Sequence, residues 1–210
     1  FRQFPVANEN PQIQRAIIAD DYALIAERNP AVQRAAAALV WTGSWYEADV
    51  AVDPRGSEDP SGALLKKIER QLRRFQRIGH DLHVKPAHYV PLDLKLCICV
   101  LPHYQRAHVK AAVLEVFGQR ALAGGKLGFF HPDNLTFGEG IFLSKIIGTA
   151  QAVAGVASGI VTRGQRLFES SNRELESGVL ALRTDDIARL DNDPNWPEHG
   201  KLEIELGGGR

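Results

Sequence analysis

The sequence lacks methionine and contains only two cysteines, Cys97 and Cys99. The cysteines stand two residues apart in an alternating apolar run, so on a strand both side chains would leave the same face, which disfavours a mutual disulfide. With no other cysteine in the chain, a disulfide scaffold is excluded and a reducing compartment is favoured. Because even an initiator methionine is missing, we expect that Phe1 is not where the gene begins and that the chain is part of a longer protein.

Long hydrophobic runs and an excess of either charge are also missing. No stretch approaches the roughly 20 apolar residues of a membrane-spanning helix, and the opening residues FRQFPVANENPQ lack the regions of a signal peptide. The 25 basic and 25 acidic residues give a formal net charge of zero. This balance argues against a surface built as a whole to attract nucleic acid. We therefore expect an ordinary soluble globular protein without a membrane contact.

The N-terminal third predicts an arm, a short helix and a strand pair. Residues 1–18 include two prolines and no sustained periodicity, so they are interpreted as an arm or linker from a missing N-terminal region. Asp20 or Asp21 can cap the helix that follows. The segment 32–52 is apolar on both sides of Thr-Gly-Ser, a pattern typical of a strand, a turn and a second strand.

The clearest helix is predicted over 61–78, with apolar residues at helical spacing on one face and basic residues on the other. A half-buried strand is predicted over 92–100, where LDLKLCICV alternates. Further helices are predicted over 108–117 and 141–153. The remaining strand candidates are VASGIV after Gly155 and the short segments 179–182, 187–190 and 202–206.

These elements predict an α+β fold of two small modules, with helices packed on mostly antiparallel sheets. The first module spans 19–101 and the second spans 102–165. Residues 166–210 are expected to form an irregular β-rich segment with a flexible tail at Gly207–Gly209. A helix is followed by Pro-Ala-Val and a strand in the first module, and by Ala-Gly-Val and a strand in the second. This likeness suggests an internal duplication.

Motifs for catalysis and for cofactors fail on inspection. Gly138-Glu139-Gly140 lacks the third glycine of a dinucleotide-binding turn, RALAGGKL lacks the first glycine and the hydroxyl of a phosphate-binding loop, and there is no G-x-S-x-G element. No catalytic residue and no cofactor are therefore predicted.

Metal binding is not predicted either. Histidines at spacings of three and five along a strand point to alternating faces, and the pair of cysteines lacks a second pair of ligands. The histidines in question are His80, His83 and His88. The string DNDPNW imitates the start of a calcium loop but lacks its glycine, so a turn is preferred. His131, in FFHPDN, is the most enzyme-like histidine, although the same string suits a rigid loop, which we favour.

Six basic residues form the outer face of the helix predicted over 61–78, and they are the candidate partner contacts: Lys66, Lys67, Arg70, Arg73, Arg74 and Arg77. Such a face suits phosphates, anionic lipid or an acidic protein surface, and a plain solvated face is the alternative. Because its one aromatic residue, Phe75, falls on the apolar side, nucleic-acid binding is not favoured. The segment 169–198 holds eight acids against three arginines and offers a complementary surface, on this chain or on a neighbour.

Three strings carry a resemblance to a known family. ADDYALIAERNPAVQRAAAALVWTGSWY, GFFHPDNLTFGEGIFLSKIIGTAQAVAGV and IARLDNDPNWPEHGKL resemble, in that order, the C-terminal region of baseplate J-like proteins of contractile phage tails and phage-tail-like injection systems. The resemblance covers the chain from about Ala19 onward.

The resemblance implies a mechanical role without catalytic residues. Proteins of this family are wedge subunits of the baseplate. The resemblance implies that this chain assembles in the bacterial cytoplasm around a sixfold hub, helps to link the hub to the sheath, and then remains in the virion tail or injection particle. Its partners would be wedge, hub and sheath-proximal proteins and further copies of itself. The alternative is a small accessory domain that binds nucleic acid or a ligand through the basic helix 61–78 or the His131 loop.

Overall fold

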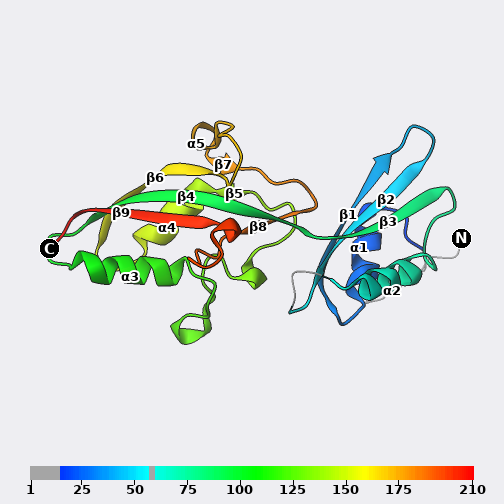
Figure 1. Cartoon of the computed structure of the whole chain (residues 1–210), viewed down its shortest axis with the longest axis horizontal. Helices are drawn as coiled ribbons and strands as arrows, with labels where there is room; N and C mark the ends of the chain where they lie inside the picture. Colours follow the sequence, from blue (N-terminus) through cyan, green and yellow to red (C-terminus); the bar gives the residue numbers. More distant parts are fainter. Residues whose placement is uncertain (1–14, 57–59) are drawn as a thin grey trace, which may run out of the picture. The chain divides into compact units, whose positions relative to one another are not determined.

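The computed structural model describes residues 15–56 and 60–210, which fall into two compact units that divide between Ala87 and His88 (Figure 1). The boundary expected after residue 101 differs from this division, because the strand that contains residues 92–100 pairs only with later strands. Arm residues 1–14 lie outside the described residues. Within the described part of the chain, no helix has both the length and the apolar character needed to cross a membrane.

Unit 1 is a three-stranded sheet with two helices on one face (Figure 1). Its elements are α1 (Ala19–Glu27), β1 (Val32–Trp41), β2 (Tyr46–Pro54), α2 (Gly62–Leu72) and β3 (His80–Pro86). The strand order is β1-β2-β3. The β1–β2 pair is the predicted antiparallel hairpin, whereas β2 and β3 are parallel and are connected through α2. The Asp21 carboxylate accepts hydrogen bonds from the backbone N–H groups of Ile17 and Ile18, so it fixes the start of α1.

The core of unit 1 lies between the helices and one face of the sheet. Tyr22 and Ile25 of α1, Val50 of β2, and Ile68 and Leu72 of α2 are all fully buried in one cluster. Alternate residues of β2 and β3 point away from this core, since successive side chains of a strand leave opposite faces. The outward set includes Glu47, Asp49, Asp81, His83 and Lys85.

Helix α2 is shorter than predicted. Ser61 caps its start, because the hydroxyl accepts a hydrogen bond from the Leu64 backbone N–H. The helix ends at Leu72 rather than at residue 78. Beyond it the chain turns so that the Phe75 carbonyl accepts a hydrogen bond from the Ala16 backbone N–H and the Phe75 ring joins the core. Periodicity alone could not show this stop, because the apolar spacing continues through Phe75.

Unit 2 is built around the long central strand β4 (His88–Val100). Its other elements are α3 (Arg106–Val116), β5 (Ile141–Phe142), α4 (Leu143–Gln151), β6 (Val156–Arg166), α5 (Glu174–Ser177), β7 (Val179–Leu180), β8 (Asp186–Arg189) and β9 (Lys201–Gly208). Strand β6 pairs antiparallel with one edge of β4. The other edge pairs in parallel with β8 and then with β9. The alternating apolar row of β4 is buried as predicted, together with apolar residues of α3 and α4.

The α+β class is confirmed, but the sheets are mixed rather than mostly antiparallel, since β2–β3, β4–β8 and β4–β9 are parallel pairs. The two units share one local arrangement. In each unit a helix ends five residues before an edge strand, and this edge strand runs antiparallel to a central strand. The other neighbour of the central strand is parallel to it. In the order helix, edge strand, central strand and parallel neighbour, the elements are α1, β1, β2 and β3 in unit 1, and α4, β6, β4 and β9 in unit 2. The chain order of these strands differs between the units, so the internal duplication stays a prediction.

The glycine-rich end is ordered, contrary to the flexible tail expected from its composition. Gly207 and Gly208 pair with Cys99 and Val100 of β4. The backbone of Arg210 donates a hydrogen bond to the Tyr104 carbonyl and accepts one from the Arg106 N–H. Gly208 has φ of 70°, and a Cβ there would lie 2.6 Å from the Val100 carbonyl oxygen. The glycines therefore permit close backbone pairing rather than mobility.

Candidate functional site

The six predicted contact residues form one exposed basic surface at α2 and at the turn that follows it. Lys66, Lys67 and Arg70 lie on the helix, Arg73 is its C-cap residue, and Arg74 and Arg77 lie beyond it. All six are exposed. We call this set the basic face. The opposite side of α2 packs against the core of unit 1, where Ile68 and Leu72 are fully buried.

Most of the charge of the basic face is available to a partner. Arg73 donates to Glu69 one turn earlier, with Nη2 2.6 Å from Oε1. Over residues 15–56 and 60–210, Lys66, Lys67, Arg74 and Arg77 have no carboxylate partner. Cations that no carboxylate neutralises attract acidic surfaces over roughly a Debye length, about 8–10 Å at physiological salt.

The acidic segment 169–198 does not offer the free acidic surface suggested by its composition. Several of its carboxylates bind arginines close by in the sequence: Glu169–Arg166, Glu176–Arg173, Asp186–Arg183 and Asp191–Arg189. Glu174 instead accepts hydrogen bonds from Ser171 and from the Asn172 backbone N–H. Much of the segment's charge is thus compensated within unit 2.

Asp186 is the one fully buried carboxylate among the described residues. It accepts hydrogen bonds from the backbone and side chain of Arg183, pairs with His88 Nδ1 at 2.8 Å, and lies 3.9 Å from the Arg166 guanidinium. Burial by itself raises the pKa of Asp186, but the bonds from Arg183 and His88 outweigh it and hold this pKa below its usual value. The pairing joins β8 to the start of β4, so its role is structural. No sequence pattern indicated this pairing.

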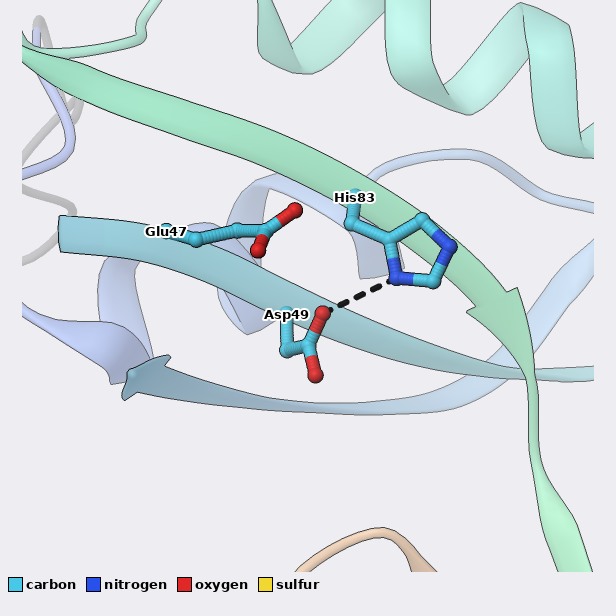
Figure 2. A group of neighbouring side chains, drawn as sticks. All are labelled: Glu47, Asp49 and His83. Carbon is cyan, nitrogen blue, oxygen red and sulfur yellow. Dashed lines mark hydrogen bonds and ion pairs between the residues drawn. The ribbon is translucent and has the colours of Figure 1, made fainter. Parts of the chain in front are cut away.

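A second cluster lies on the face of the unit 1 sheet that points away from the helices. Glu47 and Asp49 are two residues apart on β2, and His83 is the registered neighbour of Asp49 on β3 (Figure 2). Asp49 Oδ1 lies 2.9 Å from His83 Nδ1, and Asp49 Oδ2 lies 3.2 Å from Lys85 Nζ. No sequence pattern indicated this group, because it depends on the parallel β2–β3 register.

The histidines considered from the sequence do not converge. His80 contacts the Tyr22 hydroxyl, His83 contacts Asp49, and His88 contacts Asp186. His131 Nδ1 accepts a hydrogen bond from the Asp133 backbone N–H at the start of a short 3-10 turn, Pro132–Asn134. The structural role favoured for His131 stays a prediction.

Apolar side chains gather at the tip of the β1–β2 hairpin. Val40, Trp41, Trp45 and Tyr46 are each about half exposed, at 46%, 56%, 50% and 47%. The Trp41 and Tyr46 rings meet edge to face at 5.1 Å, and Thr42 closes the turn through hydrogen bonds to Trp45. Exposed, rigid aromatic residues are typical of protein interfaces. We call this set the aromatic tip.

Unit 2 carries a surface hollow of about 390 Å³ next to α4. Its walls are mainly apolar and include Leu127, Phe129 and Ile141. The charged residues Glu139 and Lys145 also line it. Lys145 pairs with Glu139 at 3.6 Å and lies over the Phe129 ring.

Residues 14–85 match the family described as Baseplate J-like central domain, and they make up most of unit 1, which spans Phe1–Ala87. No curated protein sequence matches the chain. Among solved structures, the chain is similar to a protein in the "Cryo-EM structure of the anti-feeding prophage (AFP) baseplate, 6-fold symmetrised", with a TM-score of 0.51 and 13% sequence identity. The match covers 83% of this chain and 37% of that chain, so this chain spans little more than a third of that protein. At such identity the likeness establishes the fold. The resemblance to baseplate J-like proteins found in the sequence is thereby confirmed, with residues 14–85 as the part that matches the Baseplate J-like central domain.

Proposed function

We propose that this chain is a structural part of the baseplate of a contractile phage tail or injection system. The observation that carries the proposal is the match of residues 14–85 to the Baseplate J-like central domain. In the finer form of the proposal, the protein is a wedge subunit that binds wedge, hub and sheath-proximal proteins and further copies of itself around a sixfold axis. It would assemble in the bacterial cytoplasm and act without catalysis.

The described surfaces suit a scaffold. The basic face and the aromatic tip offer two chemically different contacts on unit 1, one for an acidic surface and one for an apolar surface. A stable subunit contact buries roughly 1,200–2,000 Å² and is usually centred on a few aromatic or arginine residues. The aromatic tip and the arginines of the basic face supply both kinds of residue.

Electron microscopy of the intact particle tests the proposal. Antibody-fragment or gold labelling of an affinity tag inserted in this chain should mark the baseplate, in six copies or a multiple of six. Label on the tube or sheath, or a chain that is absent from purified particles, would contradict it.

The basic face is expected to speed assembly rather than to stabilise the fold. Reversing two of its charges, with Arg70→Glu and Arg74→Glu together, should slow association with baseplate partners about 10-fold at low salt, because complementary charge mainly raises the association rate. The difference in association rate between the variant and the parent chain should become smaller as the salt concentration rises. Stopped-flow or surface plasmon resonance measurements across a salt series would check this.

A matched control changes two exposed cations of unit 2, with Lys110→Glu and Arg120→Glu, and so alters the net charge equally. Equal slowing by both double variants would mean that net charge, not the basic face, matters. If the basic-face variant instead lost salt-sensitive binding to DNA or RNA, the accessory-domain alternative would gain support.

A further inference from the structure

The cluster on the outward face of the unit 1 sheet brings together three side chains of the kinds that bind metal ions. One carboxylate oxygen of Glu47, one of Asp49 and a ring nitrogen of His83 all lie within 4.8 Å of one another. They are the one such group found among the described residues. Two adjacent, parallel strands hold them: Glu47 and Asp49 share a face of β2, and His83 is registered beside Asp49 on β3 (Figure 2).

The local charge around these residues favours a cation. Glu47 stands directly opposite Asp81 in the β2–β3 register, and Asp49 is two residues away on the same face. Neighbouring strands lie about 4.8 Å apart, and like charges placed opposite one another are destabilising. Neither Glu47 nor Asp81 has a cationic partner in the part of the chain that the structure describes. Lys85, the nearby cation, is directed at Asp49.

Small movements would complete a coordination shell. Bonds of about 2.0–2.1 Å to a tetrahedral zinc ion place the donor atoms roughly 3.4 Å apart. Asp49 Oδ1 and His83 Nδ1 are already 2.9 Å apart, so they need to separate slightly. Glu47 has a flexible side chain, so it can close the remaining gap by changing rotamer.

Lys85 is compatible with a bound ion. Its Nζ contacts Asp49 Oδ2, whereas Oδ1 is the oxygen that faces His83. A carboxylate can bind a metal through one oxygen while an outer hydrogen bond to the other oxygen fixes its orientation. Lys85 would act in this way.

We propose that Glu47, Asp49 and His83 form a binding site for a divalent cation of the zinc class. Imidazole nitrogen with carboxylate oxygen is a donor set that zinc and similar transition ions accept. Three protein ligands leave one position of a tetrahedral ion open to water or to a donor from a neighbouring molecule. The site does not depend on the proposed baseplate function.

Calorimetric titration of the full chain with Zn²⁺ alone tests the site, in a background with Cys97→Ser and Cys99→Ser so that thiolates do not bind the probe. One equivalent of Zn²⁺ should bind. Glu47→Gln and His83→Gln should each weaken this binding about 10-fold or more, because each removes one of three ligands. Binding of equal strength in both variants, or no binding by the parent chain, would overturn the proposal.

Two controls keep the result interpretable. His131→Gln removes a histidine that also has an acid nearby, Asp133, and should leave Zn²⁺ binding unchanged. Thermal unfolding with EDTA present checks the fold. There Glu47→Gln should be at least as stable as the parent chain, since it removes the repulsion with Asp81, so its loss of binding would not reflect unfolding. A parent-like affinity in Glu47→Gln would by itself be decisive against the site, even if His83→Gln failed to fold.

Discussion

Replacing Asp186 by asparagine should destabilise unit 2 by about 3 kcal/mol. The Asp186 carboxylate is fully buried and is held by the Arg183 backbone and side chain and by His88. An asparagine of the same shape presents N–H donors toward donors, and Arg183 keeps only weaker contacts such as that with Asp185 at 3.9 Å. Breaking a buried pair in this way is costly. Removing one partner of a buried pair usually costs about 3–5 kcal/mol. We expect the lower end of this range because the Arg183 side chain is 64% exposed. Urea unfolding, with hydrogen exchange of the β4 and β8 amides to locate the change, would measure it.

The effect of Asp186→Asn should depend on pH in one direction. Because folding lowers the pKa of Asp186 below its usual value of 3.8, the folded state favours the ionised carboxylate. The stabilisation is therefore complete above about pH 5 and is lost as the pH falls through the lowered pKa. The gap in stability between parent and variant should stay constant from pH 7 to about 5 and narrow in more acidic solution.

Glu176→Gln is the matched control for Asp186→Asn. Glu176 pairs with Arg173 at 3.7 Å, but both side chains are exposed, at 74% and 83%. Such a pair contributes at most about 1 kcal/mol. A loss in Asp186→Asn no larger than in this control, or a gap that widens in acid, would show that the buried pairing does not stabilise unit 2.

Leu72→Ala should cost unit 1 about 3 kcal/mol. Leu72 is fully buried at the end of α2, in one cluster with Ile25, Val50 and Ile68. Truncation removes its packing and leaves a cavity, and such changes cost about 2–5 kcal/mol. Hydrogen exchange of the β2 amides, together with urea unfolding, would measure the loss.

The same substitution bears on assembly, because Arg73 and Arg74 directly follow Leu72 and depend on the docked helix for their position. Lys67→Ala is the control, since Lys67 is exposed on the outer side of α2 and its loss should change stability by no more than about 0.5 kcal/mol. Equal losses in Leu72→Ala and Lys67→Ala would mean that α2 is not anchored by its apolar side.

Local sequence patterns were sufficient to predict those elements that depend on a few consecutive residues. The period-two alternation of LDLKLCICV predicted β4 and its buried row, because that period places every second side chain on one face. Thr42, Gly43 and Ser44 between two apolar runs predicted the β1–β2 hairpin. Helices α3 and α4 appeared within a few residues of their predicted bounds. The exposure of Lys66, Lys67 and Arg70 likewise follows from their helical spacing on α2.

The structure alone decided everything that depends on distant pairing. The sequence could not assign β4 to unit 2, because its partners β6, β8 and β9 follow it by more than 50 residues. Nor could it place His83 beside Asp49 or His88 beside Asp186, since both contacts depend on parallel registers. The glycine-rich end was misjudged for the same reason: its composition predicts a flexible backbone, whereas pairing with Cys99 and Val100 of β4 makes it part of β9. Side-chain period and turn chemistry are properties of a few consecutive residues, but strand register is set by packing between segments that only the folded chain brings together.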